Sequence, residues 1–254
     1  MPRGEPSSSD SGRCFVVSGG ASGIGGAVAR RLAADGHTVA IIDLNIDAAH
    51  ETAANLGDRH LAVQADLGEE RQVVAAFATI ASRFPTIHGL AACAGINDMT
   101  PFEELDSEIF ARIYRVNVIG TFLCMREAVK LIGAGGGRIC TVSSVAGLRG
   151  GGIFGTAAYS ASKGAIIALT KTAARTLAPR CIAVNCVVPG PVETPMLLPH
   201  WQDEQQRLRV QSLIPIGRPG TPDEVANTIC WLLSPDASLL TGTTLVADGG
   251  MIMH

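Results

Sequence analysis

The sequence predicts an α/β fold with a doubly wound, mainly parallel sheet of seven strands and helices on both faces. Short apolar runs that are typical of buried strands alternate with longer segments of helical apolar spacing. With 254 residues, of which 47% are hydrophobic, the chain is long enough to enclose one large core. Repeated alternation of this kind indicates a parallel sheet between two helical layers, a three-layer α/β/α arrangement.

Strands are predicted where short, mainly apolar runs are bounded by turn residues such as glycine, aspartate, serine or proline. In chain order these runs are residues 14–17, 38–42, 60–64, 87–92, 138–142, 182–188 and 244–247. Helices are predicted between them where apolar residues recur every three or four positions. In chain order these segments are residues 28–34, 46–56, 69–83, 107–132, 158–177 and 222–233.

The remaining segments set the domain organisation. The glycine-rich stretch 147–155 is expected to be a loop, and residues 191–215 carry no strand signal. We interpret residues 13–254 as one domain, with 191–215 as a lid over its ligand site. Residues 1–12 are rich in Pro, Ser and Gly and are predicted to be a disordered tail.

The composition disfavours several classes of function. The net charge is −3 and no basic block stands out, so neither nucleic acid nor a membrane is expected as a partner. No apolar run reaches the roughly 18 residues that cross a bilayer, and the N-terminal segment does not resemble a secretory signal. The seven cysteines form no C-x-x-C pair. This favours buried, reduced thiols in a cytoplasmic protein and no metal site.

Polar residues and glycines follow most of the predicted strands. The carboxyl ends of parallel strands meet at one edge of a sheet, where ligands bind near the point at which the strand order reverses. We therefore expect these residues to converge at that edge: Asp43, Asp66, Gly95, Ser144, Pro189 and Gly190.

A glycine turn between the first strand and the first helix predicts a dinucleotide site. Gly19, Gly23 and Gly25 form G-x-x-x-G-x-G, which lets the backbone approach a pyrophosphate at a helix N-terminus. Asp43 ends the next strand, where a carboxylate binds ribose hydroxyls and repels a 2′-phosphate. No arginine lies within 41–47, so NAD(H) is favoured over NADP(H). The simpler alternatives are a glycine turn without a ligand and a helix-capping role for Asp43.

Tyr159 and Lys163 are four residues apart in a predicted helix and therefore share one face. A cation beside a phenol favours the phenolate and lowers the phenol pKa. Such a tyrosine can exchange a proton with an alcohol or a carbonyl oxygen. Taken alone, the pair is better explained as a surface contact at helical spacing.

Together with other motifs, these residues resemble the short-chain dehydrogenase/reductase family, in particular its compact members of similar length. The glycine turn, the strand-end acid and the Tyr-x-x-x-Lys pair are three of the matches. The others are Val116-Asn117-Val118-x-Gly120, Ser143-Ser144-Val145-Ala146-Gly147, Asn185-x-Val187-x-Pro189-Gly190 and the segment 217–226 followed by Asp248-Gly249-Gly250.

The resemblance implies a Rossmann-like oxidoreductase that moves hydride between a nicotinamide cofactor and a secondary alcohol or its ketone. It makes Tyr159 the general acid/base, with Lys163 lowering the Tyr159 pKa and binding the nicotinamide ribose. Ser144 would bind the substrate oxygen, and Asn117 would hold a water of a proton relay. The implied cofactor-binding residues are Gly19, Ser22, Gly23, Ile24, Gly25, Asp43, Leu44, Asp66, Leu67, Ala94, Gly95, Tyr159, Lys163, Pro189, Gly190, Val192 and Thr194.

The substrate is not defined by these motifs. The expected substrate pocket combines Ser144 and Tyr159 with apolar residues, namely Ile96, Ile153, Phe154, Met196 and Trp201. Secondary alcohols, 3-oxoacyl groups, steroids and cyclic diols all remain open. The chain departs from the family pattern at Ala92-Cys93, where two asparagines are usual, which weakens the expected bracing of the cofactor wall. Cys93 is interpreted as a small packing residue and not as a nucleophile.

Three other functions are weighed against this one. The first is a 3-oxoacyl-type ketoreductase that uses NADPH, and the second is a dinucleotide-binding regulator without turnover. The intact set of Asn117, Ser144, Tyr159 and Lys163 argues against the regulator. The third is a sugar-nucleotide epimerase or dehydratase, whose glycine spacing and greater length differ from this chain. The family resemblance also implies a homotetramer paired through the helices at 107–132 and 158–177.

Overall fold

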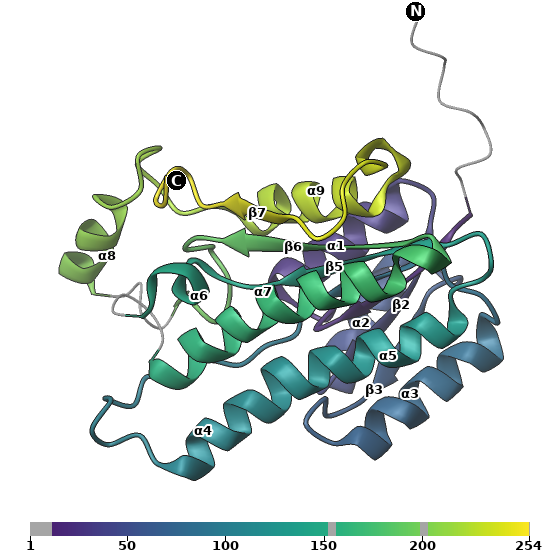
Figure 1. The fold of residues 1–254 in the computed structure, drawn as a ribbon, viewed down its shortest axis with the longest axis horizontal. Coiled ribbons are helices and arrows are strands. Elements are labelled where there is room, and N and C mark those ends of the chain that lie inside the picture. Colours follow the sequence, from purple (N-terminus) through teal and green to yellow (C-terminus); the bar gives the residue numbers. More distant parts are fainter. Residues whose placement is uncertain (1–11, 152–155, 199–202, 254) are drawn as a thin grey trace, which may run out of the picture.

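The computed structural model describes residues 12–151, 156–198 and 203–253. Its centre is one sheet of seven parallel strands in the order β3-β2-β1-β4-β5-β6-β7 (Figure 1). The predicted Rossmann-like, doubly wound sheet is therefore confirmed. The strands are β1 (Cys14–Ser18), β2 (Thr38–Asp43), β3 (Leu61–Gln64), β4 (Gly89–Ala92), β5 (Gly137–Val142), β6 (Ile182–Pro189) and β7 (Thr244–Ala247).

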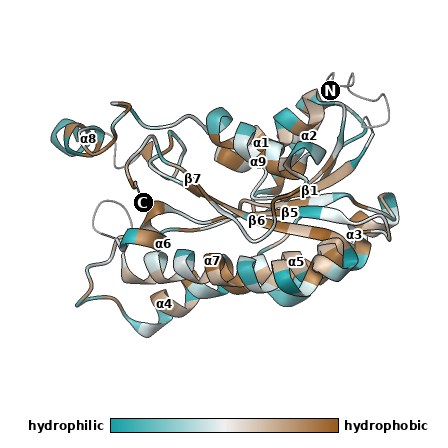
Figure 2. Cartoon of the chain, turned by 45° about the horizontal axis from the view of Figure 1, so that its top comes forward, coloured by the Kyte–Doolittle hydropathy of each residue, from teal (hydrophilic) through white to brown (hydrophobic). Residues whose placement is uncertain are grey.

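Two layers of helices cover the sheet (Figures 1 and 2). One layer contains α1 (Gly23–Ala34), α2 (Ile46–Leu56) and α9 (Pro222–Leu233). The opposite layer contains α3 (Glu70–Arg83), α4 (Ser107–Tyr114), α5 (Thr121–Leu131) and α7 (Ala157–Leu177).

Alternate residues of each strand supply the two cores. Phe15, Val17 and Ile41 pack with the layer of α1, α2 and α9. Val16 and Ile42 lie on the other side and pack with α3 and α5. Successive side chains of a strand point to opposite faces, so a strand buried on both faces must be apolar throughout. This explains why the continuous apolar runs of the sequence are strands.

The segment 107–132 differs from its prediction as one helix. It consists of α4, a six-residue π-helical turn η1 (Arg115–Gly120) and α5. A Cβ at Gly120 would lie 2.8 Å from the carbonyl oxygen of Leu67, so the helix passes unusually close to the end of β3. π-Helical turns often occur at functional sites, and this one carries Asn117.

Two short helices occupy segments for which no helix was predicted. Ser144 caps α6 (Val145–Arg149), because its hydroxyl accepts a hydrogen bond from the Ala146 amide at 3.2 Å. The predicted loop 147–155 is therefore partly helical. Within 191–215 the chain forms α8 (Glu204–Gln211), which Asp203 caps. Capping by these short polar side chains explains where both helices, α6 and α8, begin.

The described residues bear on three further predictions. Within 12–151, 156–198 and 203–253, no helix is long and apolar enough to cross a membrane. The same residues contain no cluster of His, Cys, Asp or Glu that could hold a metal. The predicted tail lies almost wholly outside the described residues, which begin at Gly12.

Candidate active site

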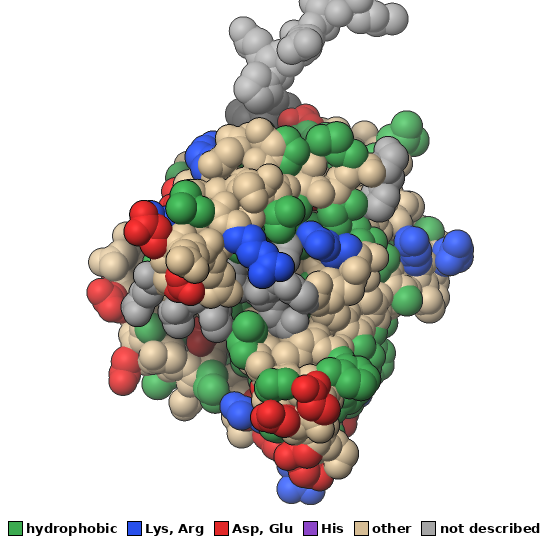
Figure 3. Space-filling model, turned by 90° about the vertical axis from the view of Figure 1, so that its left-hand side faces the viewer, with side chains coloured by type: hydrophobic (Ala, Val, Ile, Leu, Met, Phe, Trp, Pro, Cys, Tyr) green, Lys and Arg blue, Asp and Glu red, His purple; other side chains and the backbone are tan. Residues whose placement is uncertain are grey.

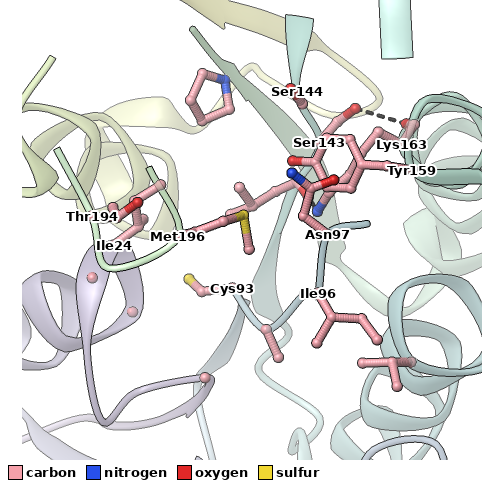
Figure 4. A pocket seen from close by; sticks show the side chains of 18 of the residues that line it. Ile24, Cys93, Ile96, Asn97, Ser143, Ser144, Tyr159, Lys163, Thr194 and Met196 are labelled. Carbon is pink, nitrogen blue, oxygen red and sulfur yellow. Dashed lines mark hydrogen bonds between the residues drawn. The ribbon is translucent and has the colours of Figure 1, made fainter. Parts of the chain in front are cut away.

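A cavity of about 620 Å³ opens at the carboxyl edge of the sheet, between the ends of β1, β4, β5 and β6. All the predicted cofactor-binding residues line it, together with Ser144, Ile96 and Met196 (Figure 4). Asn117 does not line the cavity and lies buried beside it. Ile153, Phe154 and Trp201, predicted for the substrate pocket, lie outside the described residues.

The glycine turn is built for close approach of another molecule. Gly19 and Gly23 have φ angles of 68° and 54°, which favour glycine. A Cβ at Gly25 would lie 2.1 Å from the Gly19 carbonyl oxygen, so no other residue fits there. Ser22, the residue before α1, makes no side-chain capping hydrogen bond. The first amides of α1 are thus left for a ligand, and the turn fits a dinucleotide pyrophosphate.

Two carboxylates line the cavity at the carboxyl ends of β2 and β3. Asp43 accepts hydrogen bonds from the amides of Ala21 at 3.0 Å and Asn45 at 3.1 Å, so it braces the glycine turn as well as lining the cavity. It does not cap α2, whose cap is the side chain of Asn45. Asp66 accepts a hydrogen bond from the amide of Gly68 at 2.8 Å. These bonds hold both carboxylates in place.

The segment after β6 forms the opposite wall of the cavity. Val192 pairs with Gly220, and the Glu193 amide donates to the Gly220 carbonyl at 2.9 Å. Thr194 donates its hydroxyl to the Val192 carbonyl. Met196 follows on the same stretch, and its side chain extends into the cavity (Figure 4). This wall is thereby tied to the start of α9.

Tyr159, Ser144 and Lys163 meet in the cavity. Tyr159 lies in the first turn of α7, and Lys163 lies one turn further on with its Nζ 5.7 Å from the Tyr159 ring centre. Lys163 is only 5% exposed and donates to the Val142 carbonyl at 2.9 Å. Burial lowers the pKa of Lys163 to about 8, because the charged form loses its hydration.

The structure corrects the expectation that the pKa of Tyr159 is lowered. Burial raises the pKa of Tyr159, and the hydrogen bond with Ser144 offsets this only in part. Loss of hydration disfavours the charged phenolate. Tyr159 is therefore a protonated phenol at neutral pH.

This pKa shift can be measured directly, because the chain has only two tyrosines. In Tyr114→Phe, the near-ultraviolet phenolate absorbance then reports Tyr159 alone. We expect no phenolate between pH 7 and 9, and ionisation only above the ordinary tyrosine pKa of about 10. The matched Tyr159→Phe protein supplies the Tyr114 curve. Phenolate formation near pH 8 in Tyr114→Phe would contradict the raised pKa of Tyr159.

Asn117 holds the wall beside Lys163. Its side-chain oxygen accepts from the Ile96 amide at 2.8 Å, and its Nδ2 donates to the Ile96 carbonyl at 2.9 Å and the Ser162 hydroxyl at 3.0 Å. This amide therefore joins the end of β4 to α7 across the π-helical turn. Both Nδ2 hydrogens are used, so the side chain has a structural task independent of the predicted water relay.

The comparisons with known proteins agree with this geometry. A family model described as enoyl-(acyl carrier protein) reductase matches residues 19–252. The chain is 37% identical over 243 residues to 2-dehydro-3-deoxy-L-rhamnonate dehydrogenase (NAD(+)) of a Sphingomonas species, covering 94% of this chain and 95% of that protein. It is 38% identical to an uncharacterized short-chain type dehydrogenase/reductase of Sinorhizobium fredii, covering 94% of this chain but 43% of that protein.

A solved structure is similar over nearly the whole chain. It is 3-ketoacyl-(acyl-carrier-protein) reductase from Brucella melitensis complexed with NADH, with a TM-score of 0.87 and 33% identity, covering 96% of this chain and 99% of that one. The chain belongs to the short-chain dehydrogenase/reductase family. It is therefore one of a family of oxidoreductases that act on CH–OH groups.

Ser143 and Ser144 both lie in the serine motif of the short-chain dehydrogenase/reductase pattern, and their contacts in the structure differ. Ser143 is buried and donates its hydroxyl to the Lys163 carbonyl at 2.7 Å (Figure 4). Ser144 interacts with Tyr159. Ser143 therefore holds α7 against β5, and Ser144 is the serine of the pair that contacts Tyr159.

The departure from the family pattern at Cys93 has a local explanation. The Cys93 amide donates to the Ser18 carbonyl at 3.1 Å, and Ala94 packs directly against Gly19. The backbone thus supplies bracing that side-chain amides provide in other members. Burial raises the pKa of Cys93 to about 12, so its thiol stays protonated, as expected of a packing residue.

Sequence reasoning missed several residues of the site. The Asp98 carboxylate accepts from the hydroxyl of Thr156, the residue before α7, at 2.9 Å. This bond ties the loop after β4 to the helix that carries Tyr159, and no motif identifies it. Three arginines also line the cavity without having been predicted, namely Arg112, Arg115 and Arg149.

Proposed function

We propose that the protein is an NAD(H)-dependent oxidoreductase that interconverts a secondary alcohol and a ketone, with Tyr159 as general acid/base. The observation that carries this proposal is the meeting of Tyr159, Ser144 and Lys163 in one cavity with the glycine cradle of α1. A scaffold without turnover would need the cradle alone. Burial of the Lys163 ammonium is unfavourable for folding, and only a catalytic or binding role of Lys163 explains why it is nevertheless buried.

The mechanism assigns one task to each side chain. Ser144 and Tyr159 donate hydrogen bonds to the substrate oxygen, and in reduction Tyr159 gives it the phenolic proton. NADH, when bound, supplies the hydride to the carbonyl carbon. Lys163 stabilises the phenolate that results, so each direction of the reaction leaves a charge that the site can accommodate.

The relay through Asn117 belongs to this proposal. After each reduction Tyr159 must regain its phenolic proton, and if Lys163 passes it one, Lys163 must in turn be reprotonated from solvent. The π-helical turn at Asn117 and the Gly95 backbone both adjoin the lysine, since a Cβ at Gly95 would lie 3.2 Å from Nζ and 3.4 Å from the Asn117 side-chain oxygen. A water bound near Asn117 would connect Lys163 to bulk solvent.

The cofactor preference rests on Asp43. Its carboxylate lines the cavity, and the next side chain, Leu44, cannot pair with a phosphate. The relative that uses NAD(+) and the similar structure that binds NADH support this choice.

Removing the Asp43 charge tests this preference. We expect Asp43→Asn to raise the ratio of kcat/KM for NADP⁺ to that for NAD⁺ about tenfold or more, because a carboxylate near a 2′-phosphate costs at least about 1.4 kcal/mol. Asparagine keeps an acceptor for the Ala21 amide. Asp47→Asn, an exposed position in the first turn of α2, removes the same charge nearby and should leave the ratio unchanged. Equal ratios in both variants would contradict the assignment.

The lid and the assembly complete the proposal. Met196 and Leu198 are exposed, whereas Leu197 is buried, so the start of the predicted lid 191–215 offers apolar surface to a substrate. Exposed apolar side chains on α4, η1 and α5, namely Phe110, Ile119 and Phe122, support a homotetramer that pairs through these helices. We further propose a cytoplasmic location, where the buried thiols stay reduced.

A 3-oxoacyl reductase is the second candidate, favoured by the similar 3-ketoacyl-(acyl-carrier-protein) reductase structure. The deciding experiment follows NADH formation or consumption with a panel of secondary alcohols, 3-oxoacyl thioesters, steroids and cyclic diols, in parallel with NADP(H). Turnover of an alcohol–ketone pair with NAD(H) supports the first proposal. A preference for 3-oxoacyl thioesters with NADPH supports the second, and absence of turnover throughout contradicts both.

A further inference from the structure

The charges that line the cavity are separated along the sheet. The carboxylates Asp43, Asp66 and Glu69 follow β2 and β3. Arg149 follows β5 at the end of α6, three strands away from β2. At about 4.8 Å per strand this is roughly 14 Å. Among the described lining residues no carboxylate lies beside Tyr159, whereas the cations Lys163 and Arg149 both line the cavity.

Arg149 has no partner of its own within 12–151, 156–198 and 203–253. It is an exposed residue, lines the cavity and makes no hydrogen bond or ion pair with a described residue. The stretches 152–155 and 199–202, which lie outside the described residues, contain no Asp or Glu in their sequence. By contrast, Arg126 and Arg218 pair with carboxylates at 2.7 to 2.9 Å.

The other two arginines of the cavity lie at the opposite end. Arg115 belongs to η1, and its Cβ lies 3.9 Å from the position that a Cβ of Gly68 would occupy, next to Asp66. Arg112 lies one helical turn earlier. Among the described lining residues, Arg149 and Lys163 are therefore the two cations at the end of the cavity that contains Tyr159. Figure 3, which views the carboxyl edge of the sheet, shows Lys and Arg side chains near the centre of this face.

The position of Arg149 sets the kind of molecule that it could bind. It lies five residues beyond Ser144 along a helix that rises about 1.5 Å per residue, so about 7.5 Å separates their backbones. Ile96 and Met196 line the same cavity with apolar side chains. A guanidinium binds carboxylates and phosphates through paired hydrogen bonds.

Resting on the oxidoreductase function proposed above, we propose that the substrate carries an anionic group, and that Arg149 binds this group. Ile96 and Met196 cover the apolar atoms of the substrate. The anion is the substrate's own carboxylate or a phosphate of an attached carrier. Both are recognised by the same guanidinium chemistry, and the test separates them.

The test compares three probes, namely 3-hydroxyhexanoate, its neutral methyl ester and 3-hydroxyhexanoyl-coenzyme A. We expect Arg149→Met to lower kcat/KM for at least one anionic probe by about tenfold to 100-fold, as for a lost charge-assisted hydrogen bond, and to change the ester less than twofold. Arg149→Lys should retain part of the effect. Arg83→Met, which removes an exposed arginine in the last turn of α3, outside the cavity lining, is the matched control.

A calorimetric titration of each probe into the protein with NADH gives a readout that needs no turnover. A loss confined to the free acid assigns Arg149 to the substrate carboxylate, and a loss confined to the thioester assigns it to the carrier phosphates. An equal loss on the neutral ester, or no loss on either anion, overturns the proposal. If no probe is turned over, the oxidoreductase proposal fails for this class, and the calorimetric comparison still decides the role of Arg149.

Discussion

Tyr159→Phe is expected to lower kcat by about 10²- to 10⁴-fold, the usual contribution of a positioned general acid. The substitution removes only the phenolic oxygen that Ser144 contacts and keeps the ring that packs beside Lys163. Binding of NADH, followed by its fluorescence, should stay within a few-fold. Steady-state turnover of any substrate found in the panel measures the effect.

Tyr114→Phe is the matched control for this change. Tyr114 stacks on Phe110 at 5.2 Å between ring centres and does not line the cavity. It undergoes the same chemical substitution and should keep nearly full activity and the same thermal midpoint. Full activity in Tyr159→Phe would remove Tyr159 from the mechanism, and a large loss in Tyr114→Phe would mean that activity depends on helix packing more than on the phenol.

Gly25→Ala is expected to weaken NADH binding at least about 100-fold, or roughly 2.7 kcal/mol. The added Cβ would lie 2.1 Å from the Gly19 carbonyl oxygen and 2.7 Å from its carbon. Both are backbone atoms of the cradle, so the turn itself must move. The first backbone amides of α1 then no longer point toward the pyrophosphate. Calorimetric titration with NADH measures the change.

Gly26→Ala is the control that tests whether replacing a neighbouring glycine by alanine is enough to weaken NADH binding. A Cβ at Gly26 meets nothing closer than 3.5 Å, and the nearest atom is the end of the flexible Arg30 side chain. Alanine in a helix is favoured over glycine by about 0.8–1.0 kcal/mol, so this variant should bind NADH normally and melt slightly higher. Equal affinities in the two variants would show that the cradle is not the phosphate site.

Local patterns explain why most elements were predictable. The helices at 46–56 and 222–233 have the predicted bounds. The second begins with a complete capping box between Thr221 and Glu224. The strand 244–247 also has its predicted bounds. In each case neighbours along the chain supply the deciding signal, either a cap or a run of apolar residues that both faces of the sheet require.

Deviations from the predictions arise where distant segments meet. The π-helical turn at Asn117 interrupts a sequence that is helical throughout by its spacing, in a helix that passes close to the end of β3. The raised pKa of Tyr159 follows from burial under several elements, whereas the prediction considered only Lys163. The bond between Asp98 and Thr156 joins residues 58 apart in the chain.

The sequence by itself determined the parallel α/β sheet, the family, the glycine turn and the residues that stand at the strand ends. These depend on apolar spacing and on motifs a few residues long. Only the tertiary structure decided that Asn117 braces Ile96 and Ser162, that the Ser143 hydroxyl donates to the Lys163 carbonyl, and that Arg149 lines the cavity without a carboxylate partner among the described residues. These features depend on the sheet order, which brings residues far apart in the chain to one edge.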